Sequence, residues 1–354
     1  MNCIGFLTLH LRNEETYFTE IALRAKKFGF RCYRFIPSNI TPETEMVEGE
    51  AFDAENHVWR KEQFPIPNIL YDRCFYNSDF HSTRCMAIVN WLKSKDNIQF
   101  LGFGLPNKLE LHRILSKTKL APYLPPTKMA DSPSAILKEL QKTKKIILKP
   151  IHGSQGNGIY LLEFKQKSVT VRTDKKDKQI SYTFKEETRL QAWLTRILGK
   201  REFLIQPYLH LTNHLHQPFD IRSLLQKNAR GQWKIIGKGV RVGSENRIIS
   251  NLSGGASVLN YDIWLEAQGK SANYVRNEID EILHALPLIL ETHFPPLFEL
   301  GVDIGLARDG SLWILDINSK PGRKVLLIDQ PEKTDDLYEA PLQYAKSLTE
   351  RSSI

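Results

Sequence analysis

The sequence predicts an α/β protein of two or three domains, and three observations lead to that class. Short apolar runs alternate with amphipathic segments through the first hundred residues, which is the pattern of βαβ units around a parallel sheet. The rest of the chain mixes strand-like and helix-like segments and includes a clear hairpin near the C-terminus. Finally, 354 residues with 41% hydrophobic and 25% charged content suit a globular protein with more than one core.

The first unit, residues 1–105, is predicted as a small parallel α/β domain. Its strands are expected at 4–8, 31–35, 68–72 and 98–101, and its helices at 16–28 and 81–92. The stretch 37–66 is polar and rich in Pro and Glu, so we expect a loop there with some edge structure.

Two further units are expected at 106–210 and 211–354. The second begins with a helix, because Asn107 followed by Glu110 is typical of an N-cap with its reciprocal partner. Its other elements are expected as helices at 133–142 and 187–198 and strands at 145–149, 158–163, 169–172, 180–184 and 203–206. The third unit is expected to hold strands at 219–225 and 233–242, a helix within 261–288, a hairpin and a terminal helix at 336–349.

The hairpin is predicted at 301–318, where two apolar runs flank Asp309-Gly310. An Asp-Gly pair is the strongest short-range signal for a two-residue hairpin loop. With that loop Asp303 lies directly opposite Asp316, and Asn318 shares their face. The other face is then apolar, with Val302, Ile304, Leu306, Trp313, Leu315 and Ile317.

The two facing carboxylates of this hairpin suggest a metal site. Like charges placed opposite one another destabilise a sheet, and a hard cation would remove that cost. A few oxygen ligands suit Mg²⁺ shared with the phosphates of a nucleotide. Two alternatives remain open. In the first, Asp303 is solvated and Asp316 simply ends a strand. In the second, a three-residue loop shifts the register and breaks the alignment of the two carboxylates.

A glycine-rich turn at 150–158 directly follows Lys149, which ends an apolar strand. Gly153, Gly156 and Gly158 let backbone amides approach a phosphate closely. The next segment is strand-like and no Gly-Lys-Ser/Thr ending is present, so the turn is neither a P-loop nor a dinucleotide fingerprint. One interpretation is a hairpin flap over phosphates, and the other is an ordinary turn beside a surface lysine.

The strand expected at 203–206 turns at Pro207 and carries groups suited to an adenine ring. The break frees backbone carbonyl and amide groups to bind the edge of the base, while aliphatic side chains cover its faces. Taken alone, a plain strand that leads into a turn explains this segment better.

Asp220 and Arg222 share one face of the strand expected at 219–225, and Arg241 follows on the next strand. Arginine is suited to bidentate capture of a carboxylate or a phosphate. The alternative is a structural ion pair between Asp220 and Arg222.

Charge and composition narrow the class of partner. The net charge of +9 suits anionic partners such as ATP and carboxylates. The sequence contains no recognition-helix, zinc-finger or aromatic RNA-binding signature, so nucleic acid is not expected as a partner, and the basic runs at 142–145 and 175–178 are expected as solvated loops. With no apolar run of about 18 residues and no signal-peptide pattern, neither a membrane span nor secretion is expected. The four widely spaced cysteines fit reduced thiols in a cytoplasmic protein.

The order of these motifs along the chain resembles the ATP-grasp superfamily. The matching set is Lys108 near a helix start, Lys149 with its glycine-rich turn, Gln206-Pro207-Tyr208-Leu209, Asp220-x-Arg222, Arg241, Asn251 with Gly254-Gly255, Asp303, and Asp316-x-Asn318 before Pro321-Gly322. The late motifs are similar to those of the amino-acid ligase branch. Segments 67–73, 107–111 and 124–127 further resemble the YheC/YheD family of endospore coat-associated proteins.

This resemblance implies an ATP-grasp fold after an N-terminal parallel α/β domain, and it implies roles for single residues. ATP would be bound by Lys108, Lys149, Gly153, Ser154, Gln155, Gly156, Gly158, Gln206, Tyr208, Leu209 and Asn251. Mg²⁺ would be bound by Asp303, Asp316 and Asn318, with Asp316 in place of the usual Glu. The γ-phosphate or the acyl group would face Arg222 and Arg241, with Asp220 beside them, and Lys320 and Arg323 would add positive charge.

The resemblance also implies an activity, the ATP-dependent joining of a carboxylate to an amine. The carboxylate would attack the γ-phosphate of Mg-ATP, and the amine would displace phosphate from the resulting acyl phosphate. The substrates would be small molecules or peptides, with endospore coat proteins as partners, and the location would be the cytoplasm or the endospore coat. The alternative is a non-catalytic, nucleotide-binding or structural protein of the endospore coat.

Overall fold

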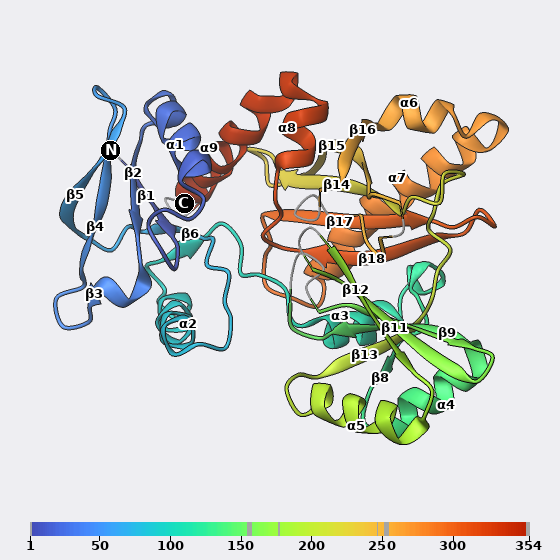
Figure 1. Cartoon of the computed structure of the whole chain (residues 1–354). Helices are drawn as coiled ribbons and strands as arrows, with labels where there is room; N and C mark the ends of the chain where they lie inside the picture. Colours follow the sequence, from blue (N-terminus) through green and yellow to red (C-terminus); the bar gives the residue numbers. More distant parts are fainter. Residues whose placement is uncertain (1, 154–157, 176–177, 246, 251–254, 352–354) are drawn as a thin grey trace.

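The computed structural model describes residues 2–153, 158–175, 178–245, 247–250 and 255–351. These residues form three sheets with helices packed against them (Figure 1). The N-terminal sheet has the strand order β3-β4-β2-β1-β6-β7, and β5 pairs with β4.

The N-terminal sheet confirms the predicted βαβ pattern. Its parallel strands are β1 (Asn2–Leu7), β2 (Phe30–Phe35), β6 (Ile69–Asp72) and β7 (Gln99–Phe100). Helix α1 (Glu15–Ala25) packs on the face that carries Ile4 and Phe6, and α2 (Phe80–Lys93) packs on the face that carries Leu7 and Leu70. The alternation of side chains along β1 therefore supplies a core on each side of the sheet.

The edge structure expected within residues 37–66 is present, but the expected loop is wrong, because most of this stretch is an antiparallel ribbon. It contains β3 (Ile40–Thr41), β4 (Met46–Asp53) and β5 (Val58–Pro65). The ribbon lies at the edge of the sheet, so its exposed positions are polar and hide the strand pattern. Buried Val47 and Phe64, which face each other, hold it to the core.

The second sheet has the order β12-β11-β10-β9-β13-β8. The strands are β8 (Lys128–Met129), β9 (Lys145–Pro150), β10 (Tyr160–Lys165), β11 (Ser168–Lys175), β12 (Lys178–Phe184) and β13 (Phe203–Pro207). Helices α4 (Pro133–Thr143) and α5 (Glu187–Leu198) share a core with Ile146 and Leu148, which point to one face of β9. Ile147 and Lys149 alternate with them and line the pocket on the opposite face.

The third sheet has the order β16-β15-β14-β17-β18 and is antiparallel. The strands are β14 (Phe219–Lys227), β15 (Trp233–Val242), β16 (Ser257–Asn260), β17 (Glu299–Leu306) and β18 (Leu312–Asn318). Helices α3 (Lys108–Leu115), α6 (Tyr261–Glu266) and α7 (Ala272–Glu291) contribute to its core. The face away from these helices is turned to the second sheet (Figure 1).

The C-terminal helices connect the third sheet to the first. Helix α8 (Lys324–Asp329) follows β18, and α9 (Thr334–Arg351) runs back to α1 (Figure 1). Leu337 and Tyr338 of α9 share a core with Phe18 and Ile21 of α1. Within the described ranges, no helix combines the length and the apolar character needed to cross a bilayer.

Candidate functional site

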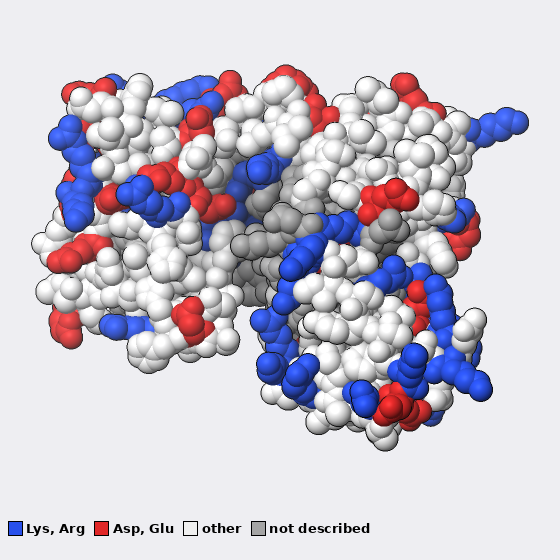
Figure 2. Space-filling model, viewed as in Figure 1, with Lys and Arg blue, Asp and Glu red and all other residues white. Residues whose placement is uncertain are grey.

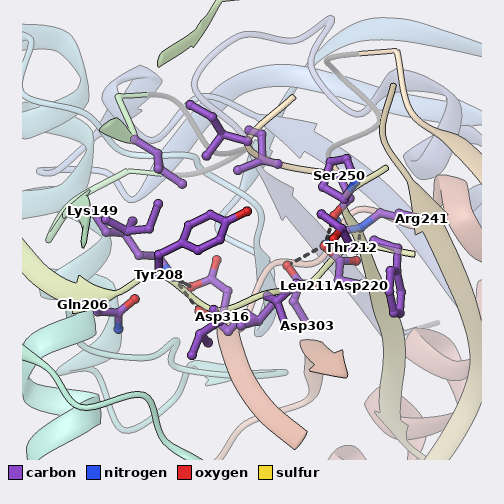
Figure 3. Close-up of a pocket in the computed structure, with 18 of the residues that line it drawn as sticks. Lys149, Gln206, Tyr208, Leu211, Thr212, Asp220, Arg241, Ser250, Asp303 and Asp316 are labelled. Carbon is purple, nitrogen blue, oxygen red and sulfur yellow. Dashed lines mark hydrogen bonds and ion pairs between the residues drawn. The ribbon is translucent and has the colours of Figure 1, made fainter. Parts of the chain in front are cut away.

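A pocket lies between the second and third sheets and contains most of the residues that the motifs singled out. Its space amounts to about 1070 Å³, including the part that is open to solvent, which is large enough for a nucleotide. Figure 3 shows Lys149, Gln206 and Tyr208 on one side, Asp220 and Arg241 on the other, and Asp316 and Asp303 between them. The sequence therefore brings cations, carboxylates and an apolar strand end into one cleft.

The hairpin of β17 and β18 forms one wall of this pocket, and its loop differs from the predicted one. Leu306 pairs with Leu312, and Ala307 bonds to Ser311 through its backbone N–H, so the loop has three residues instead of two. Gly310 in this loop has a φ of 85°, which favours glycine. This loop shifts the register by one residue, as the alternative considered above requires.

A bulge restores the alignment of the two carboxylates. The pairing shifts again between Asp303 and Ile304, because Ile304 lies opposite Ile314 while Asp303 lies opposite Asp316. Leu315 is the extra residue on the bulged strand. The predicted pairing of Asp303 with Asp316 is thus confirmed, although the reason given for it is wrong.

The bulge also changes which side chains of β18 face the core. Ile314 is buried with Val302 and Ile304, whereas Leu315 lines the pocket. Trp313 lies opposite Gly305, on the same side as the carboxylates. The predicted core positions of Trp313 and Leu315 are therefore wrong. The prediction assumes a two-residue loop, whereas the loop in the structure has three residues.

Asp303 lies between two arginines. It forms ion pairs with Arg222, which is directly opposite on β14, and with Nη2 of Arg241 at 2.9 Å. Burial acts to raise the pKa of Asp303, but the charges of Arg222 and Arg241 outweigh it and hold the pKa well below its usual value. Asp303 is thus an anion at neutral pH.

Asp316 lies between two lysines. Nζ of Lys108 donates to Oδ1 of Asp316 at 2.7 Å, and Nζ of Lys149 lies 3.8 Å from the same oxygen. Lys149 also donates to the carbonyl oxygen of Leu315 at 2.5 Å. Burial acts to raise the pKa of Asp316, but the charges of Lys149 and Lys108 lower it overall.

Lys149 itself has a strongly lowered pKa. Burial, together with the charge of Lys108, lowers its pKa to about 8, against the opposing effect of Asp316. Its ammonium group is therefore largely charged at pH 7 and becomes neutral not far above it. The charges of Asp316 and Asp303 do not offset burial and the charge of Lys108, so an anionic ligand beside this ammonium group would be favourable.

Asp220 and Arg241 form a second buried pair across β14 and β15. Arg241 donates to both carboxylate oxygens at 2.7 and 2.8 Å, and the hydroxyl of Ser250 donates to Asp220 at 2.5 Å. The alternative ion pair of Asp220 with Arg222 is wrong, because the register places Arg241 opposite Asp220 and Asp303 opposite Arg222. Burial raises the pKa of Asp220, against the effect of Arg241.

The strand end after β13 forms the apolar side of the pocket. Gln206, Pro207, Tyr208 and Leu209 all line it, together with apolar side chains from both sheets. The side-chain amide of Gln206 donates to Thr127 at 2.9 Å. Nζ of Lys145 lies 3.7 Å from the centre of the Tyr208 ring, which fixes the ring by a cation–π contact.

The residues that the resemblance implies as Mg²⁺ ligands fit that role only in part. Asn318 lies beyond Asp316 on β18, and its amide donates to Asp316 at 3.3 Å. Across the described segments, no group of three or more His, Cys, Asp or Glu side chains is close enough to hold a metal. Two carboxylates and an amide oxygen fit Mg²⁺ only if phosphates and water supply the remaining ligands, which is how Mg²⁺ binds with nucleotides.

The glycine-rich turn is described only at its ends. Gly153 lines the pocket, and Gly158, with a φ of 79°, precedes β10. Strands β9 and β10 are antiparallel, so the turn does join a hairpin as predicted. The implied roles of Ser154, Gln155, Gly156 and Asn251 fall on residues outside those that the structure describes.

Two implied contributions of positive charge are wrong. Lys320 donates to the backbone oxygen of Cys74 at 2.7 Å and pairs with Asp72 at 2.8 Å. Arg323 is 6% exposed and pairs with Glu299 at 2.9 Å. Both cations are held by acidic residues that the sequence does not place near them.

Sequence reasoning missed one residue that joins the two walls of the pocket. Asp174 lies on β11, and its Oδ2 accepts hydrogen bonds from the backbone N–H groups of Ile248 at 2.8 Å and Ile249 at 3.3 Å. Ile248, Ile249 and Ser250 line the pocket, and Ser250 bonds to Asp220. Asp174 lies in a run of lysines, so nothing in its own segment marks it.

Comparison with solved structures identifies the class of protein. D-cycloserine synthetase DcsG is similar with a TM-score of 0.56 and 12% identity, covering 99% of both chains. D-alanyl-alanine synthetase A from Vibrio cholerae has a TM-score of 0.54 and 12% identity, covering 98% of both chains. A peptide-associated ATP-grasp ligase of Chryseobacterium gregarium has a TM-score of 0.54 and 12% identity, covering 96% of both chains. At such low identity the likeness shows the fold, which is the ATP-grasp fold.

Comparison of sequences identifies the family within that class. The model of the YheC/D-like ATP-grasp family matches residues 97–348. The endospore coat-associated protein YheC of Bacillus subtilis (strain 168) is 39% identical over 356 residues, which cover 100% of this chain and 98% of that protein. YheD of the same organism is 26% identical over 349 residues, which cover 96% of this chain and 76% of that protein. The chain belongs to the YheC/D-like ATP-grasp family.

Proposed function

We propose that this protein is an ATP-dependent carboxylate–amine ligase that forms an amide through an acyl phosphate. One observation carries the proposal: Asp303 and Asp316 face each other in the cleft, and four cations surround them. Membership in the ATP-grasp family supports it, as do neighbours of the same fold that are named as synthetases and ligases.

In this proposal the strand end after β13 binds the adenine ring, and the triphosphate extends toward Asp316. When ATP binds, Lys108 and Lys149 leave Asp316 and contact the phosphates instead. Lys149 thereby gains a stronger anionic partner. Asp303, Asp316 and Asn318 would hold Mg²⁺, which would neutralise phosphate charge when bound. Both Asp303 and Asp316 have lowered pKa values, so no proton has to leave before the metal binds.

The chemical obstacle is the approach of a carboxylate to a triphosphate, because both are anions. Arg222 and Arg241 lie at Asp303 and offer remaining N–H donors to the incoming carboxylate and the γ-phosphate. Asp220 orients Arg241 by two hydrogen bonds. No side-chain nucleophile is needed, since positioning and electrostatic stabilisation supply the catalysis.

We further propose that the substrates are an amino acid or peptide of the endospore coat, and that the protein acts in the cytoplasm or at the coat. The name of the YheC relative supports this location. The competing role is that of a non-catalytic nucleotide-binding protein of the coat.

The test is release of ADP that depends on Mg²⁺ and on both an added carboxylate and an added amine. Asp316→Ala should abolish this release, whereas Asp309→Asn, at the exposed tip of the same hairpin, should leave it unchanged. Mass spectrometry of the product identifies an amide. Calorimetry separates the competing role, because Mg-ATP binding that produces no ADP with any substrate pair would indicate a protein that binds nucleotide without catalysis.

A further inference from the structure

The positive charge of this protein is concentrated in the unit that carries the second sheet. Residues 106–210 contain 21 Lys and Arg against nine Asp and Glu, a net charge of +12, whereas the whole chain has +9. The other two units together are therefore slightly acidic. Figure 2 shows blue side chains on several sides of the lower body that contains this sheet, and few red ones. ATP, bound deep in the cleft, does not account for charge on the outer surface.

The same body exposes a long, unprotected strand edge. β12 pairs with β11 on one side only and forms the end of the sheet. Between Gln179 and Phe184 the strand has no charged residue and no proline, although natural edges are usually protected by such residues. Ser181, Tyr182 and Thr183 are exposed, and 48% of Tyr182 is accessible to solvent. A row of backbone donors and acceptors is thus available to another extended chain.

Exposed cations lie at both ends of this edge. Lys175 and Lys178 pair with each other where β12 begins, and Lys185 follows directly where it ends. The turn between β10 and β11 brings Lys167 to the same end as Lys185. Among the residues that the structure describes, these four lysines form no ion pair. The two groups are separated by the length of the strand, roughly 23 Å for seven residues.

We infer that β12 binds an extended acidic polypeptide, which adds as a further strand to the second sheet with its acidic residues at both ends of the edge. Main-chain hydrogen bonds would supply affinity, and the lysines would select acidic residues about seven positions apart. A polypeptide is favoured over a nucleic acid or an anionic membrane, because only a polypeptide has the backbone groups that complete a strand edge. The uncharged centre of β12 also offers no phosphate contacts.

The position of β12 connects this surface to the cleft. Asp174, on the neighbouring strand, pairs with Gln179 and also bonds to the loop that lines the pocket. The beginning of β12 is therefore connected through Asp174 to one wall of the pocket. The binding itself does not depend on the chemistry of the site; only the interpretation of this polypeptide as the ligase substrate rests on the proposed function.

The experiment measures binding of a fluorescent peptide to the full chain by anisotropy, without ATP or Mg²⁺. The probe has two glutamates at each end and alternating threonine and valine between them. The double variant Lys178→Glu/Lys185→Glu should weaken binding at least about tenfold. Lys138→Glu/Lys142→Glu is the matched control, since these lysines are exposed on α4 of the same body and the charge change is the same. It should change binding less than about twofold.

Hydrogen exchange tests the mode of binding, because strand addition should protect backbone amides of residues 178–184. Equal loss of binding in the two double variants, or no protection at 178–184, would overturn the inference. So would a single-stranded oligonucleotide or a vesicle of anionic lipid that binds as tightly and depends on the same two lysines. Peptide binding in a protein that forms no amide would refute the proposed function and leave this inference intact.

Discussion

Asp303 and Asp316 lie directly opposite each other on β17 and β18, and a bulge at Leu315 compensates for the three-residue loop between the strands. Each carboxylate has its own pair of cations. Arg222 and Arg241 lie at Asp303, and Lys108 and Lys149 lie at Asp316. We interpret the first group as a fixed anchor and the second as the part that changes partners when a triphosphate enters.

The anchor around Asp303 should be important for stability. Asp303→Asn removes the negative charge between Arg241, which is buried, and Arg222, whose side chain is 11% exposed. Breaking a buried ion pair on one side costs about 3–5 kcal/mol, and we expect a loss of unfolding free energy near the lower end because Asn keeps one acceptor oxygen. Urea denaturation at pH 7 measures it. Asp309→Asn at the hairpin tip should show no measurable change, and equal behaviour of the two variants would refute the role of Asp303.

The carboxylate of Asp303 also predicts how the unfolding free energy depends on pH. The pKa of Asp303 is lowered in the folded protein, so its contribution is fully present above its unfolded pKa of about 4 and decreases as the pH falls below it. The difference in unfolding free energy between wild type and Asp303→Asn should thus be constant between about pH 5 and 7 and shrink below pH 4. Denaturation curves at several pH values test this. A difference that persists unchanged at pH 3 would show that the charge of Asp303 is not responsible.

Lys149 predicts a dependence on alkaline pH. Burial and Lys108 lower its pKa to about 8, so the free protein loses this charge as the pH rises above that value. Affinity for Mg-ATP should then fall above pH 8, by at most about tenfold per pH unit, because binding has to restore the proton. Lys149→Arg keeps the charge and should bind with little change between pH 7 and 9. Fluorescence titration of both proteins checks this, and identical pH profiles would exclude Lys149 as the group that titrates.

Asp174 predicts coupling between the two walls of the pocket. Asp174→Ala removes two hydrogen bonds to the backbone of Ile248 and Ile249, which line the pocket. Hydrogen bonds to a charged acceptor contribute about 1.5–3 kcal/mol, so the KM for ATP should rise about tenfold or more while kcat changes less. Steady-state kinetics measure both constants. Lys138→Ala, at an exposed position on α4 of the same body, should behave as wild type, and an unchanged KM in Asp174→Ala would contradict the coupling.

Most elements of this fold could be predicted from the sequence, because their local patterns agree with their burial. The strand Trp233–Val242 and the helix Glu187–Leu198 have the predicted bounds. The ribbon formed by β4 and β5 could not be found, since an exposed edge carries polar residues and shows no apolar alternation.

The candidate site could be predicted as a set of residues but not as a network. Local spacing places Asp220 and Arg222 on one face, yet their partners depend on the register with β15 and β17, which a single strand does not specify. The bulge at Leu315 has no signal of its own, because leucine fits a strand equally well. The ion pairs of Arg323 and Lys320 cannot be predicted for the same reason, because the acidic residues that hold them come from distant segments.

The central claim is that Asp303 and Asp316 bind Mg²⁺ together with the phosphates of ATP. A crystal structure with Mg²⁺ and a non-hydrolysable ATP analogue tests it most directly. The account predicts a metal ion ligated by both carboxylates and by phosphate oxygens, with Lys108 and Lys149 moved from Asp316 to the triphosphate. A triphosphate bound elsewhere, with Lys108 still bonded to Asp316 and no metal at either carboxylate, would contradict it.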